Sequence, residues 1–568
     1  MAEYLSPGIY VEEYDSSPRS IEGVGTSTAG FVGIAEKGPT IGEPQLITSF
    51  AEYQRQYGGY LSVHTHGEYR FLPYSVEQFF ANGGTRCYVS RVIPQDAKSA
   101  KASQGILSFE AANEGKWGNR ITISITGTSK RKMQLVEAVS DRAYKAKAIV
   151  GFGNGDIVTF AGEANRIESI LENVITFENA FSADPVDDAL VPKSLVYSAE
   201  LDIAVQSDGY VENFRGVTLN VDSADYVLRR LANSAIIKVE AKASDAIVPP
   251  IQLIFDTETD KGTITFSSGS DGTIASANAG TFIGVDKGPG QRTGIAAYKE
   301  NNVVSLLAVP GVTIPEVLVA LTTHCENEQN RFAVIDVPID TVNTGEIAEY
   351  REIIDSSYAA VYHPWVQVYD RLAQAPAYIP PSGAVLGVYS RTDVERGVHK
   401  APANEPVRCT GLSTNYTAKE QDILNPIGVN LLRALPGQGI RVWGARTASS
   451  DSRFKYVNVR RLFIYVEESI KNSTNWVVFE PNSTDLWGRV QMTITSFLEG
   501  LYASGMLAGD SSAQAYFVDI GPSTMTRDDI ENGRLICNIG IAPVKPAEFV
   551  IFRVTQFTAE AGGAGAEE

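Results

Sequence analysis

The spacing of hydrophobic residues predicts two styles of structure along this chain. In residues 29–92, and again from about residue 290, apolar runs alternate with segments of helical period, which favours β–α–β units and a largely parallel sheet. Between residues 96 and 288, short stretches of strict alternation are separated by turns, as at Ile121, Ile123 and Ile125. We therefore expect an α+β or α/β multidomain protein whose core is interrupted by a β-rich insertion of one or two domains.

Caps, breakers and apolar periods place the individual elements. Strands are expected at residues 29–35, 87–92, 121–126, 151–160, 235–239, 262–267, 305–310, 332–337, 359–362 and 439–446, the last as a buried strand. Helices are expected at residues 49–57, 74–82, 222–233, 315–328, 344–356, 380–396, 456–472 and 486–505. The helix at 456–472 is amphipathic, with one apolar face formed by Val459, Leu462, Phe463, Val466 and Ile470.

The last ordered stretch, residues 516–557, combines strands with a capped helix start. Residues 516–520 and 535–541 are expected as strands. Thr526 followed three residues later by Asp529 matches a capping box, in which a hydroxyl and a carboxylate satisfy free backbone groups. A final run is apolar on both faces, as in a strand that is covered on both sides: Phe549, Val550, Ile551 and Phe552. The open question is which sheet this final strand joins.

The first residues form another short extended segment, residues 4–15, followed at residues 16–30 by a stretch with the composition of a linker. About five backbone hydrogen bonds at roughly 1 kcal/mol each, with about 2 kcal/mol for each of Ile9 and Val11, only offset the ordering of six residues at about 1–2 kcal/mol each. Such a segment should order on a waiting sheet, which could belong to another copy of the chain.

Five sequence blocks carry a resemblance through their order along the chain. They are YLSPGIYVEE at 4–13, TAGFVGIAEKGP at 28–39, FFANGGTRCYVSRV at 79–92, NEGKWGN at 113–119, and the closing block at 516–557. Together they resemble contractile tail sheath proteins, the family that forms the contracting tube of myovirus tails and of phage-tail-like injection particles. The resemblance extends from near residue 1 to about residue 557 and is weakest in the middle.

The resemblance implies a division of the chain into a sheath-like core and its appendages. These parts are an N-terminal arm and linker (1–28), core parts at 29–95 and 290–546, an inserted β-rich outer domain or domains at 96–289, and a C-terminal strand arm with a flexible tail (547–568). Both arms would add to a sheet in a neighbouring subunit, with flexible connections at residues 16–25 and 543–546. The arm residues implied to make these contacts are Tyr4, Ile9, Tyr10, Val11, Phe549, Val550, Ile551, Phe552 and Val554.

The function implied is that of a structural subunit, which polymerises around an inner tail tube and contracts to drive the tube through a target cell envelope. The implied partners are further copies in stacked hexameric rings, the tube protein, and baseplate and tail terminator proteins. The dense helices after residue 380 could form the inner wall that grips the tube. Assembly would occur in the bacterial cytoplasm, and the product would be part of a virion tail or a phage-tail-like particle.

Composition narrows the alternatives. The 568 residues allow about four domains, and 43% hydrophobic with 20% charged residues is typical of globular proteins. With 48 basic and 67 acidic residues, the net charge of −19 disfavours nucleic acid and anionic membranes as partners. Four cysteines without a CxxC pair fit buried thiols in a reducing compartment. The acidic first 18 residues and the lack of a long apolar run argue against a signal peptide and membrane insertion.

The search for catalytic or ligand-binding motifs gives only candidates with a simpler explanation. His64 and His66 form an HxH pair without a third metal ligand at useful spacing, so a solvated loop is the expectation. GFGNGD at residues 151–156 lacks the lysine and the glycine spacing of a phosphate loop, which favours a hairpin turn. The chain has no GxSxG, and the remaining histidines have no recognisable Ser or Cys partner: His324, His363 and His399.

An acidic cluster, Asp528, Asp529 and Glu531, could hold a cation, but carboxylates in the first turn of a helix are ordinary because they face its positive end. We therefore predict no catalytic, cofactor or metal residues. The alternative function is a soluble acidic enzyme, hydrolase-like, with a β-rich accessory domain. A sheath subunit remains the preferred hypothesis because the alternative lacks a catalytic constellation.

Overall fold

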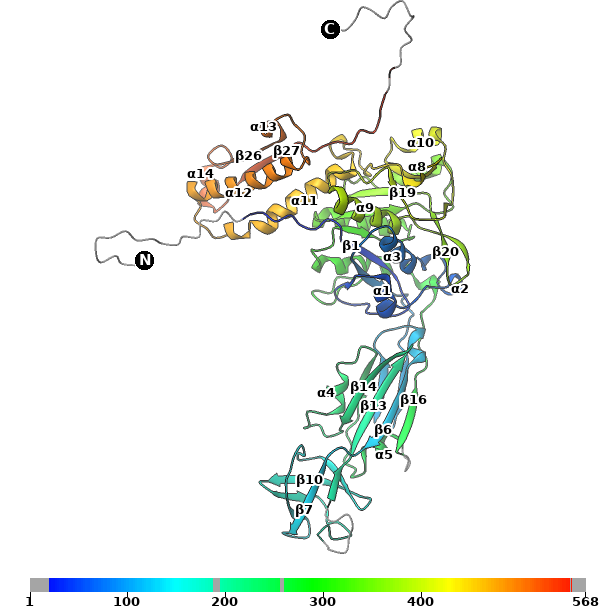
Figure 1. The fold of residues 1–568 in the computed structure, drawn as a ribbon, viewed down its shortest axis with the longest axis vertical. Helices are drawn as coiled ribbons and strands as arrows, with labels where there is room; N and C mark the ends of the chain where they lie inside the picture. Colours follow the sequence, from blue (N-terminus) through cyan, green and yellow to red (C-terminus); the bar gives the residue numbers. More distant parts are fainter. Residues whose placement is uncertain (1–19, 187–194, 256–259, 552, 554–568) are drawn as a thin grey trace, which may run out of the picture.

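A nine-stranded sheet lies at the centre of the protein, of which the computed structural model describes residues 20–186, 195–255, 260–551 and 553 (Figure 1). In spatial order its strands are β2 (Gln45–Ile47), β3 (Cys87–Val92), β1 (Ala29–Ile34), β17 (Leu306–Ala308), β18 (Phe332–Asp336), β19 (Ala359–His363), β24 (Val429–Leu435), β25 (Gly439–Val442) and β22 (Glu405–Pro406). The neighbours from β3 to β24 are parallel, and the outer pairs are antiparallel. The predicted β–α–β units and largely parallel sheet are confirmed.

Helices cover both faces of this sheet because its inner strands are apolar on both sides. β1, β18 and β19 are buried along their whole length. Helices α1 (Phe50–Tyr57), α3 (Leu72–Ala81) and α9 (Ser382–Arg396) pack on one face, and α7 (Pro315–Glu328), α8 (Thr344–Glu352) and the 3-10 helix η4 (Gly294–Glu300) pack on the other. A Cβ on Gly383 would lie 2.4 Å from the carbonyl oxygen of Ser75, so α9 approaches α3 too closely for a side chain there.

One predicted element of this region is wrong in extent and burial. Residues 439–446 were expected as a buried strand, but β25 ends at Val442, the only one of its four residues that is buried. β25 is exposed because it lies near the edge of the sheet, where its outer neighbour is the two-residue strand β22. Beside this edge, β20 (Val366–Asp370), β21 (Ala375–Ile379) and β23 (Gly411–Leu412) form a small separate sheet, and α10 (Ala418–Leu424) precedes β24.

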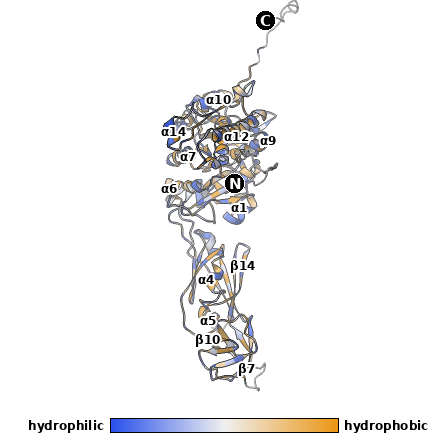
Figure 2. Cartoon of the chain, turned by 90° about the vertical axis from the view of Figure 1, so that its left-hand side faces the viewer, coloured by the Kyte–Doolittle hydropathy of each residue, from blue (hydrophilic) through white to orange (hydrophobic). Residues whose placement is uncertain are grey.

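Between β3 and η4 the chain forms two β-rich units that extend away from the central sheet in both views (Figures 1 and 2). The nearer unit, here called the sandwich, has one sheet of β4 (Lys101–Gln104), β5 (Leu107–Ala111) and β15 (Ile237–Ala241), and one of β6 (Thr122–Thr128), β13 (Glu200–Ser207), β14 (Tyr210–Val217) and β16 (Lys261–Thr265). The farther unit is a closed barrel of β7 (Lys132–Ala138), β8 (Ala143–Ala146), β9 (Ile157–Phe160), β10 (Glu163–Leu171), β11 (Val174–Phe177) and β12 (Leu195–Ser198). Each unit has its own hydrophobic core.

Local structure in the sandwich departs from the sequence prediction at residues 222–233. Only Val227–Leu231 is helical, as α4, whereas the preceding residues form turns. The Ser223 hydroxyl accepts a hydrogen bond from the Asp225 amide, and the Thr218 amide donates to the Asp225 carbonyl. These local bonds compete with the helical ones, which explains why the helix starts late. The short helix α5 (Pro250–Phe255) belongs to the sandwich, whereas α2 (Val63–His66) precedes β3 and α6 (Ala279–Ile283) packs with α7 and η4 on the central sheet.

A buried arginine joins the insertion to the core. Arg91, at the end of β3, donates to the carbonyl oxygens of Ala35 (2.9 Å), Gly38 (2.8 Å) and Glu114 (2.7 Å). These residues belong to three of the blocks that carry the family resemblance, 28–39, 79–92 and 113–119, so the blocks meet at one place in the fold. A buried guanidinium that binds carbonyl oxygens in a fixed fork holds the two chain segments in one geometry.

The C-terminal part forms a separate layer beside the central sheet (Figure 1). It contains α11 (Val457–Ser473), α12 (Thr484–Ala503), α13 (Ser512–Ala515), β26 (Tyr516–Ile520), α14 (Arg527–Glu531) and β27 (Cys537–Ile541), and all of these except α14 share one hydrophobic cluster. The predicted capping box is confirmed, with reciprocal bonds between Thr526 and Asp529. Among the helices of the described ranges, none combines the length and apolar character required to cross a bilayer.

Candidate functional site

The sheet formed by β26 and β27 has only two strands. They pair antiparallel in full register from Tyr516 opposite Ile541 to Ile520 opposite Cys537. α12 lies against the sheet, and Gln491 on this helix donates to the Val518 carbonyl (3.1 Å). In the part of the chain that the structure describes, no third strand pairs with either edge. Apart from the Val518 carbonyl, both edges therefore present backbone N–H and C=O groups that another strand could bind.

The predicted C-terminal arm residues lie away from this sheet. Phe549, Val550 and Ile551 belong to no strand, and their exposed fractions are 73%, 68% and 79%. Three consecutive exposed apolar residues of this size are unusual on a soluble surface. The other predicted arm residues lie outside the described residues, so their contacts stay a prediction: Tyr4, Ile9, Tyr10, Val11, Phe552 and Val554.

The connection that precedes the C-terminal arm, residues 543–546, was expected to be flexible, and in the structure its Val544 carbonyl accepts a hydrogen bond from Asn458 (3.0 Å). The carboxylate of Glu548 accepts hydrogen bonds from Arg446 (2.7 and 2.8 Å), Asn425 (2.7 Å) and the Tyr456 hydroxyl (3.0 Å). We call these four residues the Glu548 anchor. Partial burial acts to raise the pKa of Glu548, but the hydrogen bonds from Arg446 and Asn425 dominate and hold it below its usual range.

The N-terminal linker is also attached, in contrast to the expected flexible connection at residues 16–25. Residues 16–19 lie outside the described part, but from residue 20 the chain runs along α11. The amides of Glu22 and Val24 donate to the hydroxyls of Ser473 (3.3 Å) and Ser469 (3.1 Å) on the last turns of α11. Farther along, the Thr26 hydroxyl donates to Asp393 (2.7 Å).

Arg446 and Glu548 were missed as a pair by sequence reasoning. Their charges are opposite, but 102 residues separate them, and no local spacing links residues so far apart. The block GIRVWGAR did draw attention to residues 439–446, but for its apolar pattern and not for its last residue. The informative signal was a single carboxylate directly before the apolar run at 549–552.

The histidines occupy structural positions. His66 is buried on α2 with its Nδ1 atom 2.7 Å from the Thr65 hydroxyl, so the expected solvated loop is wrong for it, whereas His64 is exposed. Burial and the nearby Arg331 lower the pKa of His324 to about 3, so this imidazole is neutral at neutral pH. Across the described ranges, no three His, Cys, Asp or Glu side chains are grouped so that they could hold a metal ion.

His363 and His399 lie in other parts of the core. Nε2 of His363 lies 2.9 Å from the Tyr416 hydroxyl, and burial lowers the pKa of His363 to about 4. The His399 carbonyl accepts a hydrogen bond from Asn458, which fixes its backbone. Because the histidines are separated and hydrogen bonds join three of them to a neighbouring threonine, a tyrosine and an asparagine, they give the hydrolase alternative no support.

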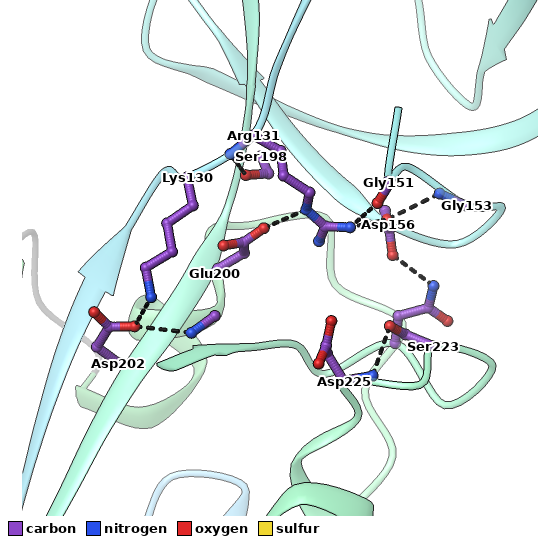
Figure 3. Close-up of polar contacts among 12 residues, drawn as sticks. Lys130, Arg131, Gly151, Gly153, Asp156, Ser198, Glu200, Asp202, Ser223 and Asp225 are labelled. Carbon is purple, nitrogen blue, oxygen red and sulfur yellow. Dashed lines mark hydrogen bonds and ion pairs between the residues drawn. The ribbon is translucent and has the colours of Figure 1, made fainter. Parts of the chain in front are cut away.

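The glycine-rich turn at residues 151–156 binds its own carboxylate. Asp156 accepts a hydrogen bond from the Gly153 amide (3.0 Å; Figure 3) and another from Asn220 (2.7 Å). A phosphate loop needs free amides that point at the anion, and here a buried carboxylate takes that place. The predicted turn at 151–156 is followed directly by β9, which begins at Ile157.

The barrel joins the sandwich through two adjacent chain segments (Figure 3). The Arg131 amide donates to the Ser198 hydroxyl (3.0 Å), and the Ser198 amide donates back to the Arg131 carbonyl (2.9 Å). The Arg131 guanidinium pairs with the buried carboxylate of Glu200 (2.5 Å), and Lys130 pairs with Asp202. Charged pairs thus surround the point where the chain enters and leaves the barrel.

The acidic cluster at the start of α14 is matched by a nearby cation. Arg534 pairs with both Asp528 and Asp529, each at 2.8 Å. Two of the three carboxylates of the proposed cation site are therefore neutralised by a side chain, as expected for charges near a helix N-terminus. Cys87 and Cys325 are buried free thiols, whereas Cys409 and Cys537 are only half-buried.

Comparison with known proteins connects these features to one family. The phage tail sheath protein central domain matches residues 287–448, and the phage tail sheath C-terminal domain matches residues 449–557. Three curated relatives are a putative prophage major tail sheath protein of Pseudomonas aeruginosa and the tail sheath proteins of Escherichia phage P2 and Burkholderia phage BcepMu. Their identities are 26%, 26% and 23%, over 49%, 48% and 73% of this chain and 72%, 69% and 84% of the relatives.

Two solved structures share the fold over nearly the whole chain. The sheath complex of an extracellular contractile injection system in its contracted state has a TM-score of 0.54 and 22% identity, and covers 99% of this chain and 100% of that one. The contracted helical sheath of the anti-feeding prophage has a TM-score of 0.53 and 21% identity, with 98% and 100% covered. With the two domain matches, the order of the sequence blocks and the sheath relatives in agreement, the chain belongs to the phage tail sheath family.

Proposed function

We propose that this protein is the structural subunit of a contractile tail sheath, which polymerises around an inner tail tube and contracts to drive the tube through a target envelope. Its partners are further copies of the chain in stacked, hexameric rings, the tube protein, and baseplate and terminator proteins. It resides in a virion tail or a phage-tail-like particle and assembles in the bacterial cytoplasm. The helices α11 and α12 form the wall that grips the tube, whereas α9 is buried between α3 and the central sheet.

The two open edges of the β26–β27 sheet carry this proposal. Each edge is five residues long, so one added strand gains about five backbone hydrogen bonds at about 1 kcal/mol each. A two-stranded sheet is marginal in water, and further strands would complete it. The chain has two candidates, its N-terminal arm (residues 4–15) and its C-terminal arm (residues 549–557).

The path of the C-terminal arm supports a neighbouring copy as its destination. After β27 the chain leaves the sheet and reaches the Glu548 anchor, which lies against Asn425 beyond the end of α10. In Figure 1 this exit and the β26–β27 sheet lie on different sides of the C-terminal part. A short arm that starts there binds a sheet of another copy more readily than its own. Repeating this head-to-tail contact generates a helical polymer.

Contraction is then a change between two packings of the same subunits. The central sheet is buried on both faces and closely packed, so it moves as a unit. The strands exchanged between copies hold the polymer together while the bodies slide. The energy is stored in the less complementary contacts of the extended form, so the movement needs no nucleotide.

Cysteine cross-linking between copies tests the strand exchange. One chain carries I551C, a second, differently tagged chain carries N538C on β27, and both carry C537S and C409S to remove the two half-buried native thiols. A disulfide between the two tags is expected in assembled tubes, because the arm of one copy lies on the sheet of the other. The matched control pairs N538C with L171C at the exposed hairpin of the barrel, which should not cross-link.

A chain with both I551C and N538C tests the alternative that the arm binds the sheet of its own copy. An intramolecular disulfide in the unassembled protein would contradict the proposal, because the arm would then fold back on its own sheet. Deletion of residues 1–15 should leave a folded monomer that forms no tubes in negative-stain electron microscopy. Normal tubes from this truncated chain would exclude the N-terminal arm as an assembly element.

A further inference from the structure

The two ends of the chain are attached to opposite ends of one helix. At the start of α11, the Tyr456 hydroxyl binds Glu548, and Asn458 donates to the Val544 carbonyl (3.0 Å). At the end of α11, the hydroxyls of Ser469 and Ser473 bind the N-terminal linker, as described above. Figure 1 shows the N-terminal linker meeting one end of α11 and the C-terminal segment leaving from the other. The helix has 17 residues, which corresponds to a length of about 25 Å.

The linker packs closely enough against α11 to exclude a side chain. A Cβ on Gly23 would lie 2.1 Å from the hydroxyl oxygen of Tyr465, well inside contact distance. A side chain at this position would therefore require the Tyr465 ring to move away from the linker. The linker and α11 are thus in close contact at Gly23.

A buried ion pair fixes α11 itself. Arg461, in the second turn, pairs with Asp393 on α9, and both side chains are 3% exposed. The Arg461 guanidinium also donates to the Thr26 carbonyl (3.0 Å) and lies over the Tyr389 ring, with its carbon 4.9 Å from the ring centroid. α9 packs on the central sheet, so α11 is tied through it to the rigid core.

We propose that α11 is a rigid spacer that fixes the separation between the exits of the two arms, and that Glu548 is the positioning residue at its N-terminal end. This inference rests on the proposed function, because it concerns where the exchanged arms begin. A copy that binds two neighbours through its two arms then holds them at a distance set by one helix and not by flexible linkers.

The chemistry of the Glu548 anchor explains how a single carboxylate can fix the position at which the C-terminal arm begins. Arg446 is 7% exposed on its side chain, and Glu548 is the carboxylate that pairs with it. A bidentate guanidinium–carboxylate pair is both strong and directional. Loss of the carboxylate leaves the Arg446 charge, the Asn425 amide and the Tyr456 hydroxyl without this acceptor. Among the described residues, the last hydrogen bond before the arm would then be the one that Asn458 donates to the Val544 carbonyl.

Release of the anchor lengthens the tether of the C-terminal arm. Four further residues, 545–548, would become free, which adds up to about 14 Å of reach. A longer flexible tether lowers the effective concentration of the arm at the neighbouring sheet. We therefore expect the critical concentration for assembly to rise several-fold, by about 3 to 30 times.

Hydrogen exchange and assembly measured on the full chain test the inference. Below the assembly concentration, Glu548→Ala should increase amide exchange severalfold in the stretch 543–548, read at its four non-proline residues, while peptides from α11 and β27 keep wild-type rates. The critical concentration, measured by sedimentation, should rise in the same variant, and Glu548→Gln should be intermediate because it keeps part of the hydrogen bonding. At the other end of α11, Gly23→Val should raise exchange in residues 20–25 and also weaken assembly.

The matched control is Glu480→Ala, which removes a surface carboxylate that pairs with Arg489 near the start of α12. It should leave both measurements unchanged. Unchanged exchange at 543–548 in Glu548→Ala, or increased exchange with wild-type assembly, would overturn the inference. A chain that ends at Glu548 separates the two proposals: if it assembles normally, the arm function itself is wrong. If that chain fails while Glu548→Ala assembles like wild type, only the role of Glu548 is excluded.

Discussion

The central sheet and the β26–β27 sheet differ in the length and exposure of their edge strands. The central sheet ends in β2 and β22, which are only three and two residues long, and helices cover both of its faces. The β26–β27 sheet has five residues on each open edge, and all ten of its residues are at least partly exposed. Short edge strands protect a sheet against pairing with other chains, whereas long open edge strands can pair with a strand of another chain.

This difference separates two kinds of stability. The central sheet gains its stability within one chain, so changes there should alter the free energy of unfolding of the monomer. The β26–β27 sheet and the arms contribute little to the monomer, and changes there should alter assembly instead. Each sheet therefore predicts a different experimental response.

Phe31→Ala should give the largest loss of monomer stability. Phe31 in β1 is fully buried, and its ring lies edge-on to Phe79 with centroids 5.7 Å apart. Removal of a buried aromatic ring lowers the free energy of unfolding by about 3–5 kcal/mol. Urea denaturation below the assembly concentration measures this change. Val394→Ala on the exposed side of α9 is the control, with a change below about 0.5 kcal/mol. A loss under about 1 kcal/mol in Phe31→Ala would contradict the rigid core.

A buried carboxylate makes the central sheet sensitive to pH in the range 4–6. Asp336, at the end of β18, accepts hydrogen bonds from Ser382 (2.7 and 2.8 Å) and the Gly311 amide (3.1 Å). Burial outweighs these bonds and raises the pKa of Asp336 to about 6. The folded state therefore binds this proton more tightly than the unfolded state. The stability from Asp336 is fully present below about pH 4 and is lost as the pH rises through 6, by about 3 kcal/mol.

The measurement compares urea unfolding of wild type and Asp336→Asn at several pH values between 4 and 7. The difference between their free energies of unfolding should change with pH in this window, because only the wild type has the titrating group. Equal pH dependence of the two proteins would exclude the raised pKa. The Glu548 anchor has the opposite sign: its pKa is lowered, so its contribution is present above about pH 4.5 and is lost as the pH falls.

Ile551→Asp should have the smallest effect on the monomer and still prevent assembly. The side chain is 79% exposed, so its replacement should change the free energy of unfolding by less than about 0.5 kcal/mol. A charge on the arm would be buried in the completed sheet, where it is costly. Light scattering should show no polymer. Leu171→Asp, at a 76% exposed position of the barrel, should assemble normally. Wild-type assembly of Ile551→Asp would show that the final strand is not an interface element.

The sequence predicted most elements of the central sheet because local signals and final structure agree there. α7 begins with Pro315 and spans the predicted range, and β3 has the predicted bounds. The inner strands of the central sheet are apolar on both faces, which is the pattern of a parallel sheet with both faces covered. Prediction failed where local bonds or position decided the outcome, as at the late start of α4 and the early end of β25.

The assembly elements were predicted in part. The apolar run at 549–551 was identified from composition, and its exposure agrees with a role outside its own chain. The anchors were not found, because Arg446–Glu548 and Arg461–Asp393 are contacts between residues far apart in the sequence. A Ser, Gly and Pro content like that of residues 16–25 is typical of flexible linkers, yet its second half follows a helix. Composition indicates how flexible a segment is by itself, but it does not show whether a neighbouring helix binds that segment.

The paired hydrogen bonds between Arg131 and Ser198 have a practical consequence for the barrel. They place the entry and the exit of the barrel one strand spacing apart, about 5 Å. A tight turn could join β6 to β13 there and leave the register of the sandwich intact, since these strands already pair along their length. An unrelated domain whose termini lie close together could be grafted at the same two residues. The barrel could therefore be exchanged for another domain, which the sandwich would then present at the outer tip of the protein.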